Sequence, residues 1–439
     1  MHNRDILPAH PENAAEGMQA HEPSTGCAAA GSGETPLRIR VVASIADVAP
    51  PVWDACAGGA GANPFTRHAF LAALEGSRSA TARTGWRPQH LVCETAGGKV
   101  AGVVPCYLKS HSRGEYVFDH SWAAAYERAG GRYYPKLQVS VPFTPASGRR
   151  LLVAPGADAR TTRAALARGL VEVTALHGAS SAHVTFMTQE EWQHLGDGCG
   201  FLRRTDQQFH WENGGFSSFE DFLGVLSSRK RKTIRRERRE AVAAGGIEIV
   251  WLTGTDLTEE AWDAFFRFYQ ETGSRKWGSP YLTRQFFSMI GDTMAKETVL
   301  IMARRRGRFI AGAINFVGDG ILFGRHWGAV EHHPFLHFEV CYYQAIEYAI
   351  AHRLARVEAG AQGEHKLARG YLPRTTYSAH YVADPALRRA IGDYLEHERG
   401  YVAEAGRELM EASPFRRDLE RGFMGDDALG QCAEEDGGF

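Results

Sequence analysis

The chain has 439 residues, of which 23% are charged, and a formal net charge of −1 at pH 7. This length exceeds what a single hydrophobic core supports, so we expect two domains. No run of about 18 apolar residues is present, which argues against a membrane-spanning helix, and the near-zero net charge requires any anionic partner to be bound by a local patch.

The two ends of the chain differ from the region between them. Residues 1–36 are rich in Ala, Gly, Pro and Glu without periodicity, so we expect a disordered leader. This N-terminus lacks the apolar segment of a signal peptide, and the seven cysteines are scattered without a C-x-x-C pair. Both features predict a cytoplasmic protein with reduced thiols. Residues 401–439 are expected to form a helix and a loose acidic tail.

Two hairpins, one in each half of the chain, have the same layout. The first joins residues 90–94 to 99–104 through a Gly-Gly turn, and the second joins residues 299–302 to 308–314 through a turn at Gly307. Each returning strand carries an Ala-Gly pair, where the missing side chain lets a neighbouring backbone approach closely. Each hairpin also leads to an aromatic-rich strand, a helix and another strand. We therefore predict two copies of one α/β unit.

The second half has the clearer periodicity. A helix capped by Ser217 or Ser218 is expected to continue to Gly245-Gly246, and a later helix capped by Thr258 is expected to end at Gly273. After the first of these helices we expect a strand at residues 247–251 and two helices at 258–273 and 283–295. Three antiparallel strands then follow at 299–303, 309–316 and 321–327, and after them a helix at 338–352 and a strand at 356–359.

This order of elements resembles the GNAT acyltransferase fold, and two copies in tandem resemble the Fem-type aminoacyl transferases of peptidoglycan synthesis. The resemblance implies an α/β (α+β) protein with two tandem GNAT-like domains, each a mixed, mostly antiparallel sheet flanked by helices. It implies a first domain over residues 37–204 and a second, carrying the active site, over residues 205–400.

Several phrases make the resemblance more specific. The basic segment 226–239 is similar to the helix that opens the second Fem-type domain, and Lys366 with Arg369-Gly370-Tyr371 is similar to that family's lysine segment. The whole chain is identified as a member of a bacterial FemAB-like "peptidoglycan biosynthesis/recognition" family, whose label does not fix a reaction. The phrases typical of that family are Tyr133–Leu137, Val141–Pro145, Arg275–Gly278, His333–Glu339 and Gly360–Lys366.

The basic segment predicts an anion site. Eight of the eleven residues from Arg229 to Arg239 are cationic, and only Glu237 opposes them. Like charges at i,i+4 destabilise an isolated helix, so their retention favours a bound anion. The anion could be a tRNA backbone, a nucleotide diphosphate or an acidic lipid; the alternative is a solvated surface helix. The residues predicted to bind it are Arg229, Lys230, Arg231, Lys232, Arg235 and Arg236.

Residues 357–374, here called the Lys366 loop, follow a predicted strand and combine glycines with ionisable residues. Acyl transfer to an amine requires removal of a proton and stabilisation of an oxyanion. The resemblance implies that Lys366 stabilises the charge, while Glu358, Glu364 and His365 remain alternative bases. An ordinary solvated loop is the other reading. The corresponding segment of the first half, residues 188–199, has no lysine, so that copy could be degenerate.

The donor remains open between aminoacyl-tRNA and acyl-CoA, and no permanently bound cofactor is expected. GNAT enzymes that use acyl-CoA hold its pyrophosphate in a glycine-rich loop before the central helix. Residues 328–335 occupy that place but lack a Gly-x-Gly, carry the anionic Glu331, and lose a backbone donor at Pro334. This departure favours aminoacyl-tRNA as the donor and tRNA as a partner.

Further polar and aromatic residues around these segments are candidates for binding the acceptor, with packing as the alternative for the aromatic ones. They are Arg325, His326, Trp327, His337, Glu339, Gln362, Tyr371, Arg374, Tyr134 and Lys136. We predict no metal site, because Pro334 interrupts the His333–His337 spacing and no H-E-x-x-H is present.

Three functions therefore stay open from the sequence. The first is an N-acyltransferase that moves an acyl group, an aminoacyl group in the favoured version, onto an amine of a cell-wall precursor or small metabolite. The second uses acyl-CoA through a divergent loop. The third is a non-catalytic module that recognises a muropeptide. The oligomeric state is not predicted.

Overall fold

The computed structural model describes residues 36–243, 246–277, 280–360 and 363–416. Nearly all of the expected leader, the acidic tail and Gln362 lie outside these residues. Fifteen strands in this part of the chain are β1 Leu37–Val42, β2 Trp86–Pro88, β3 His90–Thr95, β4 Val100–Val104, β5 Cys106–Lys109, β6 Lys136–Val139, β7 Leu152–Val153, β8 Ser181–Met187, β9 Leu202–Glu212, β10 Ile247–Thr253, β11 Thr298–Arg305, β12 Arg308–Gly318, β13 Ile321–Ala329, β14 Arg356–Glu358 and β15 Leu372–Val382.

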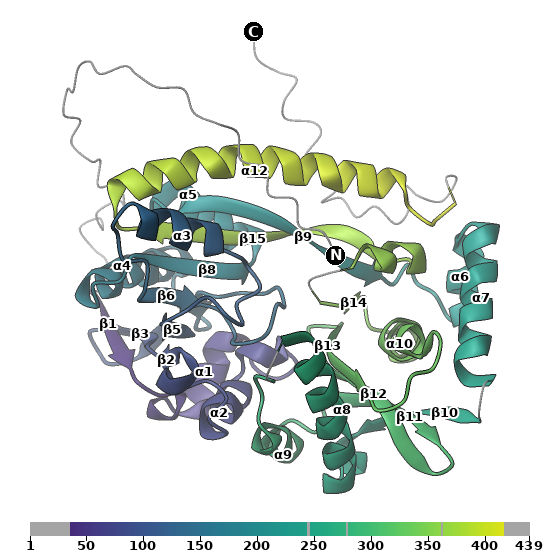
Figure 1. Ribbon diagram of the computed structural model, residues 1–439. Helices are drawn as coiled ribbons and strands as arrows, with labels where there is room; N and C mark the ends of the chain where they lie inside the picture. Colours follow the sequence, from purple (N-terminus) through teal and green to yellow (C-terminus); the bar gives the residue numbers. More distant parts are fainter. Residues whose placement is uncertain (1–35, 244–245, 278–279, 361–362, 417–439) are drawn as a thin grey trace.

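Helices connect these strands (Figure 1). The α-helices are α1 Pro50–Ala57, α2 His68–Gly76, α3 His120–Arg128, α4 Ala159–Leu176, α5 Gln189–Gly198, α6 Phe219–Val225, α7 Ser228–Ala243, α8 Glu259–Trp277, α9 Arg284–Thr293, α10 Leu336–Phe338, α11 Gln344–Ala351 and α12 Pro385–Glu411. The shorter turns are η1 Ile45–Asp47, η2 Pro64–Thr66, η3 Ala82–Thr84, η4 Gly254–Asp256, the π-helix η5 Glu339–Tyr343 and η6 Glu364–Arg369.

The two halves have related strand orders, and in the first half the strands are divided between two sheets. In the second half β10, β11, β12 and β13 are successive antiparallel neighbours, and β14 then pairs parallel with β13. In the first half β1, β3, β4 and β7 are antiparallel neighbours, and β8 pairs parallel with β6. The duplicated α/β unit predicted from the hairpins is therefore confirmed.

The halves exchange their last strands. β9, which ends the first half, pairs with β14 of the second, while β15, which ends the second half, pairs with β8 of the first. β9 and β15 also pair with each other, so eleven strands form one continuous sheet, and Figure 1 shows these two strands side by side beneath α12. The expected boundary between residues 204 and 205 falls within β9, and the one after residue 400 falls within α12.

Two helix boundaries differ from the prediction. The helix expected from Ser218 to Gly245 is broken after Val225, because Leu226 is extended and forms a bridge to Phe415. The helix expected to stop at Gly273 continues to Trp277. A Cβ at position 273 would lie 3.3 Å from the Pro280 side chain, so this glycine serves close packing instead of ending the helix.

One aromatic core crosses between the halves. The Phe65 ring, from the first half, lies 5.2 Å from both the Phe316 and Phe323 rings of the second half, in edge-on contacts. Phe70 packs in the same way against Phe286. Such pairs contribute about 0.5–1.5 kcal/mol each beyond their buried area. In the part of the chain that the structure describes, no helix has the length and apolarity needed to cross a bilayer.

Candidate active site

Glu358 is buried at the junction of the two halves. It ends the three-residue strand β14, where it stands opposite His210 of β9 on one side and Phe323 of β13 on the other. Its side chain is 3% exposed. The Ser147 N–H points to the Glu358 carboxylate at 3.5 Å, and His210 Nε2 lies 3.9 Å from it. Burial raises the pKa of Glu358 to about 7, although Arg356 lowers it.

Lys366 is buried in η6, at 2% exposure. Its ammonium donates a hydrogen bond to the Gly360 carbonyl at 2.8 Å. Burial, with a smaller contribution from the nearby Arg325 charge, lowers the pKa of Lys366 to about 8. Arg325 also acts on Glu358, so the three predicted residues share one electrostatic environment. A carboxyl and an amine with pKa values near neutrality suit acid–base chemistry at pH 7.

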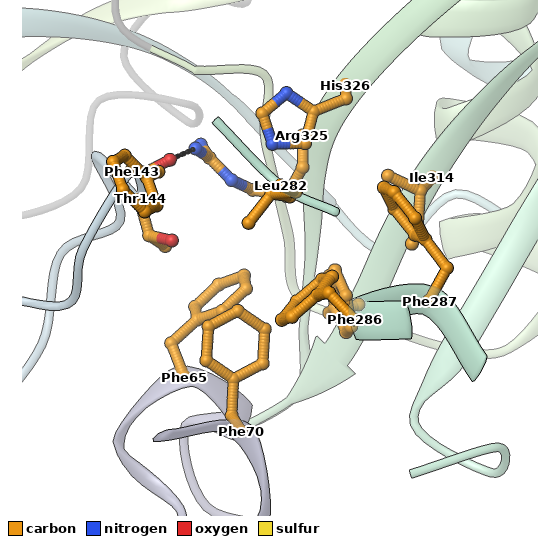
Figure 2. Close-up of a pocket in the computed structure, with 11 residues that line it drawn as sticks. Phe65, Phe70, Phe143, Thr144, Leu282, Phe286, Phe287, Ile314, Arg325 and His326 are labelled. Atoms are coloured by element: carbon orange, nitrogen blue, oxygen red, sulfur yellow. Dashed lines mark hydrogen bonds between the residues drawn. The ribbon is translucent and has the colours of Figure 1, made fainter. Parts of the chain in front are cut away.

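Arg325 links the halves directly. It reaches from β13 to donate a hydrogen bond from Nη2 to the Phe143 carbonyl at 2.9 Å, as Figure 2 shows. His326 beside it stacks edge-on with Tyr269 at 4.9 Å, and burial lowers its pKa to about 3, so it is neutral. The pocket next to them is lined mainly by phenylalanines and encloses only about 10 Å³. That space holds no more than a single water molecule, so this pocket is part of the core.

Residues of β9 complete the site and were not predicted. His210 Nε2 lies 3.4 Å from the Gln208 side-chain oxygen Oε1, and Gln208 Nε2 donates to the Pro145 backbone carbonyl at 2.9 Å. Burial keeps the pKa of His210 well below its usual range. A sequence signal existed: Asp206, Gln208 and His210 alternate with other residues, as polar side chains on one face of a strand do.

A cavity of about 160 Å³ opens beside Gln208. Its lining combines β9 with the end of β8, β15 and the segment before α3. The residues that line it are Tyr116, Phe118, Phe186, Asp206, Gln207, Gln208 and Thr376. The Tyr116 hydroxyl is also close enough to Arg325 to influence its pKa, so the cavity adjoins the Glu358 site.

Other predicted residues form a separate aromatic cluster. His365 Nε2 lies 2.9 Å from the Tyr342 hydroxyl, and the His337 ring packs 5.3 Å from Trp327 and 6.3 Å from His365. Tyr371 is buried and donates its hydroxyl to the Tyr342 carbonyl. His365 therefore lies among rings instead of beside Glu358. The Glu364 side chain lies outside the described part of the chain.

Two predicted substrate-binding residues are held by ion pairs. Glu339 is buried and accepts hydrogen bonds from Arg238 of α7, with the shortest at 2.8 Å. Arg374 lies 3.4 Å from Glu212 at the end of β9. Both contacts fasten neighbouring elements, so they account for these residues without a substrate.

The basic helix α7 has two kinds of cation. Arg229, Lys232 and Arg236 are exposed, as the predicted anion face requires. Arg231 instead donates to the carbonyls of Leu223 and Gly224 at the end of α6. Lys230 is half-buried, and Arg235 is paired with Glu220 of α6.

The inner face of α7 is tied to the Lys366 loop. Arg369 of η6 donates to both carboxylate oxygens of Glu237 at 3.0 and 2.9 Å, and the Tyr343 hydroxyl donates to the same carboxylate. Arg369 also lies 3.5 Å above the Phe338 ring. Glu237, the one acid within the basic run, is thus the anchor that joins α7 to the loop carrying Lys366.

The loop that would receive a pyrophosphate is otherwise occupied. Glu331 pairs with Arg305 at 2.6 Å and with His333 at 2.9 Å. The short helix α10 follows Phe335, whose φ is 61°. In the first half, Asp158 caps the N-terminus of α4 with its own carboxylate. The described residues contain no group of three or more acidic, histidine or cysteine side chains arranged for a metal ion.

Tyr134 and Lys136 belong to a different buried cluster. Lys136 pairs with Glu115 at 2.6 Å and with Asp119, and the Tyr134 hydroxyl lies 2.8 Å from that of Ser112. β6, which carries Lys136, stands four strands from β14 in the sheet. At about 4.8 Å per strand these residues are about 19 Å from the Glu358 site.

The segment of the first half that corresponds to the Lys366 loop is structural. Residues 188–199 form α5 and its caps. The buried Glu191 accepts hydrogen bonds from the backbone N–H groups of Arg150 and Leu151. Burial lowers the pKa of Arg150 to about 10, and the Glu191 and Glu358 carboxylates both raise it, so this segment lies near the Glu358 site.

The related strand orders, with the parallel β13–β14 and β6–β8 pairs, define a tandem protein of the GNAT class. The chain belongs to the FemAB-like family, described as peptidoglycan biosynthesis/recognition, whose family model matches residues 44–417. This confirms the family and fold predicted from the sequence.

The solved structure of FemX supports the fold. FemX matches with a TM-score of 0.50 at 12% identity, over 79% of this chain and 98% of its own. A tandem GNAT protein from the clavulanic acid biosynthesis pathway matches with a TM-score of 0.41 at 15% identity, over 80% of this chain and 99% of its own. L-PGS from Bacillus licheniformis matches with a TM-score of 0.46 at 9% identity, over 74% of this chain and 96% of its own. No curated protein sequence matches the chain.

Proposed function

We propose that this protein is an N-acyltransferase that moves an aminoacyl group from aminoacyl-tRNA onto an amine of a cell-wall precursor or another small metabolite. The observation that carries the proposal is the burial of both Glu358 and Lys366 close enough to Arg325 for its charge to lower the pKa of each. The family description, peptidoglycan biosynthesis/recognition, supports an acceptor from the cell wall.

The reaction assigns one role to each residue. The acceptor amine attacks the ester carbonyl, forming the C–N bond, and its proton passes to the Glu358 carboxylate. Lys366, protonated through most of the population at pH 7, stabilises the negative charge that develops on the carbonyl oxygen. The C–O bond to the donor then breaks, and the leaving hydroxyl takes the proton from Glu358. His210, being neutral, positions the acceptor without adding a charge.

The choice of donor rests on α7 and on residues 328–335, where Glu331 pairs with Arg305. The exposed face of α7 presents Arg229, Lys232 and Arg236, and its buried face is bonded through Glu237 to Arg369, three residues beyond Lys366. A polyanionic donor bound along α7 would therefore have its acyl end near Lys366. In contrast, Glu331 places a carboxylate where an acyl-CoA pyrophosphate would bind. A cytoplasmic location would give the protein access to charged tRNA.

Transfer assays test the proposal. Purified protein is incubated with radiolabelled aminoacyl-tRNA or with acetyl-CoA, together with a soluble muropeptide bearing a free amine. We expect transfer from aminoacyl-tRNA, lost at least a hundredfold in Glu358→Gln and Lys366→Met. Glu396→Gln and Lys99→Ala, at exposed positions, serve as matched controls and keep full activity.

Other outcomes select the remaining functions. Transfer from acetyl-CoA alone would reassign the donor. Muropeptide binding without turnover on either donor would support a recognition module. Full activity in both Glu358→Gln and Lys366→Met would contradict the assigned site.

Binding of tRNA across a salt series tests α7 separately. Each phosphate contact contributes about 0.7–0.9 to the slope of log affinity against log salt. Replacement of Arg229, Lys232 and Arg236 by Ala should therefore lower the slope by about two. Arg128, Arg132 and Arg168, exposed in the first half, provide an equal loss of charge as a control that leaves the slope unchanged.

A further inference from the structure

The 160 Å³ cavity beside Gln208 is lined by a carboxylate. Asp206 is exposed at the cavity, and one of its oxygens accepts from the Gln207 N–H at 2.7 Å. Within the described ranges, no Lys, Arg or His side chain forms an ion pair with it inside 4 Å. The neighbouring Arg204 is already engaged by both oxygens of Glu398, each at 2.7 Å, and by the Phe118 carbonyl. Burial raises the pKa of Asp206 and the nearby Arg204 charge lowers it, so Asp206 has a cation in its vicinity but, among the described residues, none at ion-pair distance.

Three aromatic rings face the same space. Phe118 is 53% exposed, although its neighbours in sequence are buried. Tyr116 and Phe186 have φ angles of 63° and 56°, in the left-handed region that costs energy for residues other than glycine. Such conformations cluster where side chains are held for a function. Rings around a carboxylate complement an ammonium group, through cation–π attraction and charge-assisted hydrogen bonds.

The cavity leads to the site along β9. Asp206, Gln208 and His210 occupy alternate positions on one strand. At about 3.3 Å per residue, Asp206 is about 13 Å from His210. Gln208 lines the cavity and its side chain also lies 3.4 Å from His210 Nε2, so it bridges the two regions. The volume equals that of about five water molecules at about 30 Å³ each, enough for one small cationic group.

We propose that this cavity binds a second ammonium group of the amine acceptor, and that the acceptor is a molecule with two basic groups separated by a spacer of about 13 Å. One amine reacts at Glu358, and the other stays protonated between Asp206 and the rings of Tyr116 and Phe118. The role of this molecule as the acceptor rests on the proposed function. Binding of an ammonium group in the cavity does not depend on that function.

Calorimetric titration of the full chain at low salt tests the inference. Spermidine is the probe, because it carries terminal amines on a long flexible chain, and a neutral diol of similar length is its control ligand. We expect saturable spermidine binding and no measurable diol binding. Asp206→Asn should weaken spermidine binding about ten- to a hundredfold, and Phe118→Ala about two- to fivefold. Asp393→Asn, at an exposed position on α12, should leave binding unchanged.

The test separates the two proposals. Glu358→Gln should keep measurable spermidine binding, because Asp206 and the rings still hold one ammonium group, while transfer is lost. An inactive site and an empty cavity therefore give different results. Absence of spermidine binding to the folded wild type, equal binding by Asp206→Asn, or equal binding of the diol would each overturn the inference. Circular dichroism confirms that both cavity variants are folded.

Discussion

His183 of β8 and His380 of β15 face each other through their Nδ1 atoms at 2.7 Å, although they are 197 residues apart. The contact joins the last strand of the second half to the sheet of the first. Because one Nδ1 must accept the proton of the other, the two rings cannot both be protonated in this arrangement. Burial lowers the pKa of His183 to about 3 and that of His380 well below its usual range.

The histidine pair predicts loss of stability in acid. The pKa of each ring is lower in the folded state than its unfolded value of about 6.5, so the unfolded chain binds more protons below that pH. The free energy of unfolding should fall by about 2 kcal/mol per histidine between pH 6.5 and about pH 5. Urea denaturation at a series of pH values measures this slope. His380→Asn should flatten it, while His397→Asn, on the exposed face of α12, should not.

Glu358 predicts the opposite dependence. Its folded pKa of about 7 lies above its unfolded value of about 4.5, so the folded state binds more protons in that window and stability falls as pH rises through it. Glu358→Gln removes this cost and should raise the free energy of unfolding by about 3 kcal/mol at pH 8. The gain should vanish near pH 4.5 and accompany the loss of transfer. A variant that is less stable at pH 8 would show that the carboxylate is ionised and well solvated in the fold.

Local patterns predicted the elements but not their partners. The hairpins at His90–Val104 and Val299–Ile314 follow from alternating apolar residues around glycine turns, and both form as expected. The exchange of β9 and β15 is a long-range pairing, and no local pattern distinguishes a strand that closes its own half from one that crosses over. The break at Leu226 is also non-local, because it depends on a bridge to Phe415.

The same limit explains the site. Lys366 and Glu358 were predicted from one segment of the chain, and the structure brings them into one environment with Arg325. His210 and Gln208 were missed because they reach that environment only through the pairing of β9 with β14. His365 was a candidate base by its neighbours in sequence, but η6 turns it toward Tyr342.

The pair of Arg369 and Glu237 predicts a stability effect. Arg369 is 6% exposed, and its replacement by Met would leave the Glu237 carboxylate buried without a cation. Breaking such a pair costs about 3–5 kcal/mol, so Arg369→Met should lower the urea midpoint accordingly. The double variant Arg369→Met with Glu237→Leu should recover much of the loss. Arg407→Met removes an exposed pair with Glu404 and should cost less than about 1 kcal/mol.

Gly328 predicts the effect of a single methyl group. A Cβ at this position of β13 would lie 2.0 Å from the Phe268 carbonyl oxygen of α8. A backbone carbonyl cannot move unless the helix moves, so Gly328→Ala should displace α8 from the sheet beside His326 and destabilise the fold by about 3 kcal/mol. Thermal unfolding measures the loss.

Two other glycines separate this effect from the ordinary consequence of adding a methyl group. At Gly312 the contact is with the flexible Met302 side chain, which can move aside, so Gly312→Ala should cost less than Gly328→Ala. At Gly224 nothing lies within 4 Å, and Gly224→Ala in α6 should be neutral or stabilise by up to about 1 kcal/mol. Equal losses of thermal stability in Gly328→Ala and Gly312→Ala would mean that α8 moves as easily as a side chain. The close contact between α8 and β13 would then not stabilise the packing of this helix on the sheet.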